Sequence, residues 1–261
     1  MKTYKFPFNA ILVLCFLTTA ITSYSQISYN LELFRDETVH FFKQPLHWDA
    51  NDWGKLGLLT ASTFLLTRID QPVRDEMFKD RSWVHSAPVE FGRMWGEVYS
   101  AGIIGGAFGL YGLVYNDNEA KRIGYEIYQT AFYAGVITTV LKAAIGRARP
   151  FTNYGPNHYN PFSIFNDDFH SLPSGHSTLA FALSTALSQN IKQDYLKWLV
   201  YIPAVLTAYS RVYQDKHWTS DVFLGAAIGY FVGTWVHNQH EENDNSVSVI
   251  PNDLITIRIS F

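Results

Sequence analysis

The sequence predicts an all-α fold, a helical bundle of about six core helices followed by a short β-like tail. Long apolar runs with helical rather than alternating spacing extend from Trp53 onward, and Gly, Pro, Asn and Asp gather between them. With 261 residues, 48% of them hydrophobic, the chain is long enough to bury one large core in a single main domain, placed at 54–238. We expect helices at residues 54–68, 88–116, 119–146, 175–191, 195–210 and 220–238, with shorter helical pieces between 28 and 50.

The first 25 residues have the pattern of a secretory signal peptide. Lys2 and Lys5 precede an apolar run from residue 6 to about residue 21, and small and polar residues follow it as far as Ser25. Cleavage before Gln26 would leave an N-terminal extension at 26–53. We therefore expect the chain to be secreted across the inner membrane and to be periplasmic or membrane-associated. An uncleaved anchor is the alternative, although the apolar run is short for the ~20 residues of a bilayer span.

The single cysteine, Cys15, lies inside the predicted signal peptide. A chain without this segment has no thiol, which excludes disulfides, a cysteine nucleophile and a zinc–cysteine site. Loss of Lys2 and Lys5 also lowers the formal charge by two, from −3 to −5. Because such an acidic protein has no general attraction for nucleic acid, nucleic acid is excluded as a partner.

Two predicted helical segments, 101–115 and 222–236, are almost uncharged and rich in Gly, Ala and aromatic residues. Segments of this kind either span a membrane or fill a soluble core. The helix at 119–146, which follows a turn at 116–118, carries Glu126, Gln129 and Lys142, and these residues suit protein contacts better than lipid. We therefore favour a soluble or peripherally attached bundle, with an integral membrane bundle as the alternative.

Two segments lie outside the helical pattern. Residues 151–172 form a long loop dense in Asn, Pro, Gly, Asp and aromatic residues, and loops of this length within compact domains are often functional. The tail at 239–261 alternates apolar and polar residues at 246–250 and at 254–261, which predicts two short strands or a hairpin.

The first of three chemical motifs is Lys142-x6-Arg149-Pro150. On a helix, residues seven apart return to nearly the same face about 10 Å further along. Pro150 disfavours helical geometry at the residue before it, so we expect the helix to end at Arg149. There the guanidinium can bind two phosphate oxygens while Lys142 supplies a point charge. The alternative is a set of solvated basic residues, with Arg147 as a third.

The second motif is Pro173-Ser174-Gly175-His176, which precedes the helical run that begins at Ser177. The motif predicts a helix N-terminus, where free N–H groups and a glycine without a side chain can bind an anion. His176 would face the same space and could protonate a leaving oxygen. The alternative is an N-cap followed by a buried histidine.

The third motif is Ser210-Arg211-x5-His217-x3-Asp221. His217 precedes a predicted helix, and Asp221, four residues further on, can contact one ring nitrogen and leave the other free to attack phosphorus. The alternative is a histidine–aspartate pair that caps a helix.

Together the three ordered motifs resemble the type 2 phosphatidic acid phosphatase superfamily, which includes bacterial acid phosphatases, lipid phosphatases and vanadium haloperoxidases. The resemblance extends over about residues 54–238 as a helical plan. It implies that His217 is a nucleophile that forms a phosphohistidine, that Asp221 orients it and that His176 is the general acid. It also implies phosphate binding by Lys142, Arg149, Arg211, the Ser174 hydroxyl and the amides near Gly175, with no metal and no cofactor.

We therefore expect a phosphatase that hydrolyses phosphate monoesters or diphosphates, with lipid-linked substrates favoured and contact with a membrane surface. The first alternative is a vanadate-dependent haloperoxidase that uses the same pocket. The second is a non-catalytic lipid-binding envelope protein. The identity of the leaving group and any oligomeric state are left open by the sequence.

Overall fold

The structure, a computed structural model, describes residues 29–247, with side chains described as far as residue 241. The predicted signal peptide and most of the predicted strand tail lie outside these residues. Within the described residues the regular secondary structure is helical, and an isolated bridge between Arg147 and Tyr159 is the one β contact, which confirms the all-α fold class. The α-helices are α2 (Leu31–Lys43), α3 (Ala50–Phe78), α4 (Ala87–Trp95), α5 (Val98–Tyr115), α6 (Asn118–Ile145), α7 (Gly175–Gln189), α8 (Asp194–Leu199), α9 (Ile202–Tyr213) and α10 (Thr219–Val247). Short 3-10 helices are η1 (Gln44–Leu46), η2 (Pro150–Thr152) and η3 (Asp167–Phe169).

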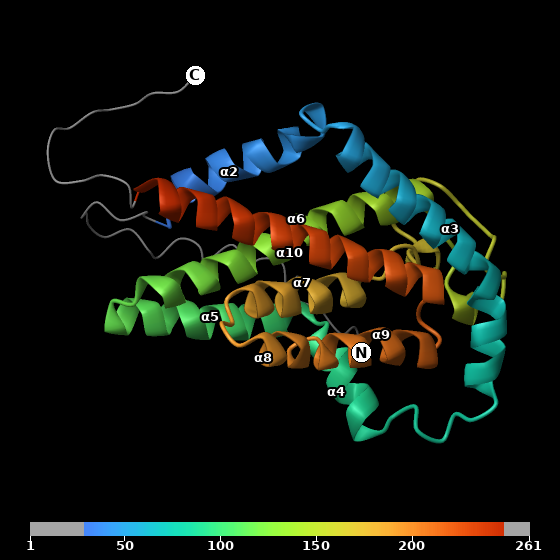
Figure 1. The fold of residues 1–261 in the computed structure, drawn as a ribbon. Helices are drawn as coiled ribbons and strands as arrows, with labels where there is room; N and C mark the ends of the chain where they lie inside the picture. Colours follow the sequence, from blue (N-terminus) through green and yellow to red (C-terminus); the bar gives the residue numbers. More distant parts are fainter. Residues whose placement is uncertain (1–28, 248–261) are drawn as a thin grey trace, which may run out of the picture.

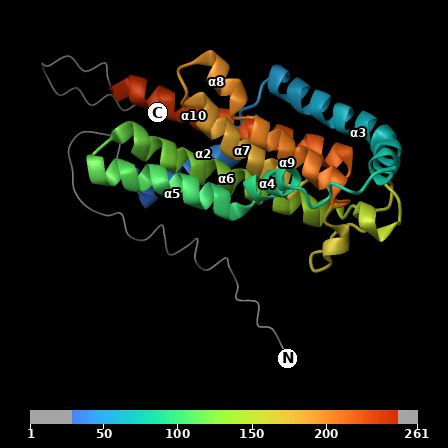
Figure 2. The same cartoon turned by 90° about the horizontal axis from the view of Figure 1, so that it is seen from below.

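Helices α6, α7 and α10 form the centre of the bundle (Figure 1). Helix α5 packs along α6, α9 along α7, and α3 crosses α10 near the N-terminal end of α10 (Figures 1 and 2). The C-terminal end of α6 and the N-terminal ends of α7 and α10 lie at the same end of the bundle (Figure 1). The residues of the three motifs are therefore brought to one end of the molecule.

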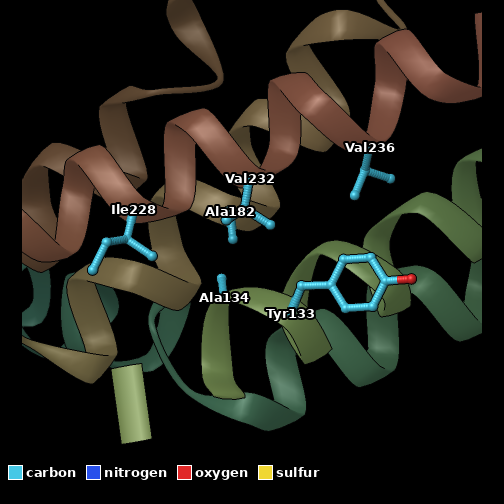
Figure 3. Packing of buried hydrophobic residues seen from close by; sticks show 6 residues of the cluster. All are labelled: Tyr133, Ala134, Ala182, Ile228, Val232 and Val236. Atoms are coloured by element: carbon cyan, nitrogen blue, oxygen red, sulfur yellow. The ribbon is translucent and has the colours of Figure 1, made fainter. Parts of the chain in front are cut away.

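The core between α6, α7 and α10 is built from small and β-branched residues. Its buried cluster, shown in Figure 3, consists of Tyr133, Ala134, Ala182, Ile228, Val232 and Val236. Two glycines of α10 allow the close approach to α7. A Cβ at Gly225 would lie 2.5 Å from the carbonyl oxygen of Ser174, and one at Gly229 would lie 2.4 Å from that of Thr178. Glycine at these two positions therefore lets α7 and α10 pack more closely than a residue with a side chain would allow.

Polar residues explain several helix ends. Asp49, Asp117 and Ser174 are the N-caps of α3, α6 and α7, and each accepts a hydrogen bond from an N–H of the first turn. Asn116 adopts the left-handed conformation, with φ of 53°, and ends α5 at the predicted turn.

Two predicted helices are each divided in the structure. The segment 88–116 is broken between α4 and α5 at Gly96, because a Cβ there would lie 2.6 Å from the carbonyl oxygen of His176 and the chain must turn as it passes α7. The segment 195–210 is broken between α8 and α9, where Pro203 lies in the first turn of α9. The bundle consequently has more helices than the six expected.

Two other helices are longer than predicted. Helix α3 continues to Phe78 with Pro72 inside it, and α10 continues to Val247. Ser246 and Val247, placed by the alternating pattern at the start of a strand, are therefore helical. The remainder of the predicted strand segments lies beyond the described residues.

The range 119–146 predicted for α6 agrees with the structure to within one residue at each end, but the expectation that Pro150 lets the helix continue to Arg149 was wrong. Helix α6 ends at Ile145, because Gly146 adopts the left-handed conformation with φ of 60° and its N–H closes the last turn onto the Lys142 carbonyl. The predicted effect of Pro150 on its neighbour is present, since Arg149 is extended with φ −73° and ψ 153°. Lys142 and Arg149 thus do not share one helix face.

The outer surface of the bundle carries many apolar side chains. Among the described residues, α5 is the one helix long and apolar enough to cross a membrane, and only 17% of its apolar window is buried. Leu110 and Val114 on α5 are 65% and 74% exposed, and Leu58 and Leu65 on α3 are 71% and 67% exposed. The choice between a soluble or peripherally attached bundle and an integral membrane bundle stays a prediction.

Candidate active site

The loop that follows α6 is tied back onto the chain segment between α6 and η2. Asn160 N–H donates to the Gly146 carbonyl, Ala148 N–H to the His158 carbonyl, and Ser171 N–H to the Arg147 carbonyl. The predicted 151–172 loop is therefore a fixed structure that brings Ser171 beside the N-terminal end of α10. A backbone hydrogen bond of 2.9 Å from Ser174 N–H to the Asp221 carbonyl joins α7 and α10 at the same point.

His217 is buried, with 3% of its surface exposed, in the loop between α9 and α10. Its Nδ1 lies 2.8 Å from the carbonyl oxygen of Ser171. Because a carbonyl oxygen can only accept, Nδ1 carries the proton and Nε2 keeps its lone pair. The ring is therefore held in the tautomer that a nitrogen nucleophile requires.

The partner predicted for His217 is different from the one in the structure. Asp221 was expected to contact a ring nitrogen, but its Oδ2 lies 3.8 Å from His217 Nδ1, beyond a hydrogen bond. The same oxygen instead accepts from the Trp218 N–H and the Ser171 hydroxyl. Asp221 thus holds the backbone directly after His217 and acts on the ring through Ser171.

Arg147, which the sequence analysis named only in the alternative of solvated basic residues, is completely buried. Its guanidinium donates to Asp221 Oδ1 at 2.6 Å and to Asp70 Oδ2 at 2.7 Å. Asp70 comes from α3 and also accepts from the N–H and the hydroxyl of Ser220 in the first turn of α10. Sequence reasoning missed both residues, because nothing in the local pattern links positions 70 and 147.

His176 lies in the first turn of α7, with its side chain 31% exposed. Its Nε2 is 3.1 Å from Oε1 of Glu97, the residue between α4 and α5. The pKa of His176 lies below its ordinary value, because burial lowers it, the hydrogen bond donated to Glu97 raises it in part, and the nearby charge of Arg211 lowers it again. Glu97 was not among the predicted site residues.

Three cations surround the histidines. Lys142 Nζ donates to the His170 carbonyl, and burial together with the charge of Arg149 lowers the pKa of Lys142 to about 7. Arg149 donates to the Asp167 carboxylate at 2.6 Å and to the Asp167 carbonyl at 2.9 Å. Arg211 is buried, and its Nε has no hydrogen-bond partner within the described part of the chain. A buried guanidinium N–H without a partner indicates a place for an anion.

These cations face His217. The pKa of His217 is well below its ordinary value, first because the ring is buried and then because Lys142, Arg149, Arg211 and His176 oppose a positive charge on it. The structure therefore brings the predicted histidines and basic residues into one electrostatic environment. His217 remains neutral at pH 7 in this environment.

The N-terminal end of α7 completes the site. Ser174 is fully buried, and its hydroxyl oxygen accepts from the N–H and the hydroxyl of Ser177, so the structure gives it a capping role. A Cβ at Gly175 would lie 3.7 Å from Cε of Lys142, which places the lysine side chain beside this helix end. A phosphate contact of Ser174 or of the Gly175 amide stays a prediction.

Among residues 29–247, no group of three or more His, Cys, Asp or Glu side chains has the arrangement of a metal site. The described fold and site define a helical bundle with two histidines and three cations at one end, the parts of an oxyanion-binding centre. Residues 127–245, which contain all three motifs, match the sequence model of the PAP2 superfamily. The predicted resemblance to this superfamily is thereby confirmed over these residues.

Curated relatives agree with this assignment. The chain is 36% identical over 109 residues to a lipid A 1-phosphatase of Rhizobium etli, a match that covers 41% of this chain and 46% of the relative. It is 32% identical over 122 residues to an undecaprenyl-diphosphatase of Sulfolobus acidocaldarius, covering 45% of this chain and 53% of the relative. The chain therefore spans about half the length of these curated relatives.

A solved structure shares the fold. The crystal structure of a transmembrane PAP2-type phosphatidylglycerolphosphate phosphatase from Bacillus subtilis superposes with a TM-score of 0.51, covering 70% of this chain and 94% of that protein. Because the sequence identity is 22%, this similarity supports the fold alone.

Proposed function

We propose that the protein is a metal-independent phosphatase that hydrolyses phosphate monoesters or diphosphates through a phosphohistidine at His217. The observation that carries the proposal is the hydrogen bond from His217 Nδ1 to the Ser171 carbonyl. It leaves Nε2 as a neutral nucleophile among the charges of Lys142, Arg149 and Arg211.

In the first step, His217 Nε2 attacks phosphorus as the ester P–O bond breaks. The leaving oxygen takes a proton from His176, so the products are a phosphohistidine, a free alcohol or phosphate, and neutral His176. The three cations stabilise the negative charge that gathers on the phosphoryl oxygens. Arg211 has an unpartnered Nε for this purpose, while Arg149 would exchange part of its contact with Asp167 for the phosphate.

In the second step, a water molecule attacks the phosphohistidine. Neutral His176 takes a proton from this water, the new P–O bond forms and the P–N bond to His217 breaks. Inorganic phosphate leaves, and both histidines return to their starting protonation states. Asp221 takes part as a positioning residue through Ser171 and Trp218.

The favoured substrates are lipid-linked phosphates or diphosphates. Matched relatives bear the names lipid A 1-phosphatase and undecaprenyl-diphosphatase. The exposed apolar side chains of α3 and α5 also favour a membrane-associated protein, where such lipids are found. We propose a periplasmic membrane location on the basis of this surface and the signal-peptide pattern of residues 1–25.

The test is phosphate release in detergent with excess chelator, from phosphatidate, a prenyl diphosphate, lipid A and soluble esters. We expect wild-type activity on at least one lipid substrate and no loss on addition of chelator. His217→Ala should lower turnover by several orders of magnitude with an unchanged melting temperature. An inactive wild-type protein on the whole panel, or full turnover by His217→Ala, would refute the proposed function.

A direct readout of the mechanism is the covalent intermediate. Brief exposure to a substrate with radiolabelled phosphate, followed by alkaline quenching, should leave acid-labile label on the wild-type protein. The label should be absent from His217→Ala. Retention of label by this variant would assign the nucleophile to another residue.

A further inference from the structure

We propose that Glu97 is a positioning residue that holds His176 as the proton donor to the leaving group, an inference that rests on the proposed function. Glu97 lies outside residues 127–245, the region that matches the PAP2 superfamily. It is the N-cap of α5 and comes directly after the break between α4 and α5. No catalytic motif of the sequence includes it.

Glu97 contacts the His176 ring directly. Glu97 Oε1 lies 3.1 Å from His176 Nε2 and also accepts from Arg93 Nη1 at 3.0 Å. Because a carboxylate accepts, His176 Nε2 carries a proton that points at Glu97, which leaves Nδ1 as the ring nitrogen for substrate. When His176 is protonated, Nδ1–H can be donated to the leaving oxygen while Nε2–H stays on Glu97.

Close backbone contacts of the α4–α5 corner hold Glu97 beside His176. A Cβ at Gly96 would lie 2.6 Å from the carbonyl oxygen of His176, so the chain touches α7 where only glycine fits. Four residues earlier, a Cβ at Gly92 would lie 2.5 Å from the backbone of Leu206 on α9. The hydroxyl of Thr207 donates to the Gly92 carbonyl at 2.5 Å. Helix α4 is thus fixed against α7 and α9, and Glu97 with it.

The charges around His176 also favour a role for Glu97. The charged or titratable groups that face His176 are Glu97 and Arg93 from the α4–α5 corner, Arg211 from α9 and His217 from the loop before α10. Lys142 from α6 stands beside the neighbouring Gly175. Glu97 is the one anion in this set, and the cations oppose protonation of His176. Without the Glu97 charge, His176 would lose the partner that favours the protonated acid.

The decisive experiment compares leaving groups in Glu97→Gln. In detergent, kcat/KM is measured for octyl phosphate, whose alcohol needs a proton to leave, and for 4-nitrophenyl phosphate, whose phenolate can leave without one. kcat/KM includes the steps up to release of the alcohol and leaves out the later hydrolysis of the phosphohistidine. It therefore reports on the step in which His176 donates its proton. We expect about a 10- to 100-fold loss for octyl phosphate and less than about a threefold loss for the aryl ester.

The matched control is Glu90→Gln on α4. Glu90 also accepts from Arg93, at 2.7 Å, and its side chain is 33% exposed compared with 30% for Glu97, but no contact joins it to His176. This variant removes one charge from the same network and should show no difference between the two esters. A selective loss in Glu90→Gln equal to that in Glu97→Gln would overturn the assignment to Glu97.

The pH profile gives a second readout. Since Glu97 raises the pKa of His176, its removal should move the alkaline limb of kcat/KM for octyl phosphate to lower pH. Glu97→Asp keeps the charge at a shorter reach and should fall between wild type and Glu97→Gln; it also serves as the test if Glu97→Gln does not fold. Equal losses on both esters with an unmoved alkaline limb, in a protein whose turnover depends on His217, would refute the role of Glu97 alone.

Discussion

Arg147 and Asp221 form an ion pair of 2.6 Å in which both side chains are completely buried, and Asp70 from α3 closes the other side of the guanidinium at 2.7 Å. Two carboxylates from distant parts of the chain are thus joined by one cation directly behind His217. A buried pair of this kind is sensitive to the loss of either partner, because the remaining charge cannot reach water.

We therefore expect Arg147→Gln to destabilise the protein by about 3–5 kcal/mol, since it leaves Asp70 and Asp221 buried without a cation. Chemical denaturation followed by circular dichroism measures this loss. The control is Arg35→Gln, which removes an arginine whose side chain is 69% exposed and paired with the exposed Asp36. Its effect should lie within about 0.5 kcal/mol of wild type. Equal stability of the two variants would contradict the buried role of Arg147.

Ser171→Ala separates the two functions of this residue. The variant removes the hydroxyl that donates to Asp221 but keeps the carbonyl that accepts from His217 Nδ1. We expect a loss of stability of about 1–3 kcal/mol, because Asp221 loses a buried donor, and a decrease in kcat of less than about tenfold. A decrease in kcat as large as that of His217→Ala would mean that the hydroxyl, not the carbonyl, controls the ring.

Phosphate binding should weaken above pH 7. Lys142 has a pKa of about 7, so its ammonium form is present below this pH and is lost as the pH rises through it. We expect KM to rise on the alkaline side of pH 7 in wild type. Lys142→Arg keeps its charge over the whole range and should show a much flatter dependence of KM on pH. Parallel profiles for the two proteins would show that another group causes the rise.

Gly225→Ala should destabilise the protein, because its Cβ would lie 2.5 Å from the carbonyl oxygen of Ser174 and α10 must move away from α7. We expect a loss of about 1–3 kcal/mol, together with lower activity, since Ser174 caps the helix that carries His176. Gly135→Ala on α6 is the control, because a Cβ there has no atom within 4 Å. It should be neutral or stabilising by up to about 1 kcal/mol. Thermal melting of both variants decides the comparison.

The all-α fold and most helix positions could be predicted from the sequence, because they depend on local spacing and on caps such as Asp117. The predicted range 119–146 fits α6, but the expected extension to Arg149 was wrong because Pro150 was given more weight than Gly146, whose left-handed conformation stops the helix earlier. The break at Gly96 could not be predicted, since it depends on contact with the backbone of His176, 80 positions further on.

Within the candidate site, the predicted pairing of His217 with Asp221 followed from helical spacing alone. The spacing does bring them within 3.8 Å, but the loop at 147–171 places the Ser171 carbonyl closer to Nδ1. The burial of Arg147, which was named only in the alternative of solvated basic residues, was not predicted for a related reason. Its burial depends on Asp70, which lies on α3 and outside every motif.

Helix α3 lies outside residues 127–245 but supplies contacts that hold the loop bearing His217. Besides Asp70, it supplies Arg74, which donates hydrogen bonds of 2.7 and 3.0 Å to the two carboxylate oxygens of Asp215, two residues before His217. A fragment of residues 127–245 would contain all three motifs but would lack Asp70 and Arg74. Such a fragment would still match the superfamily by sequence, but we expect the loop that carries His217 to lose its native conformation.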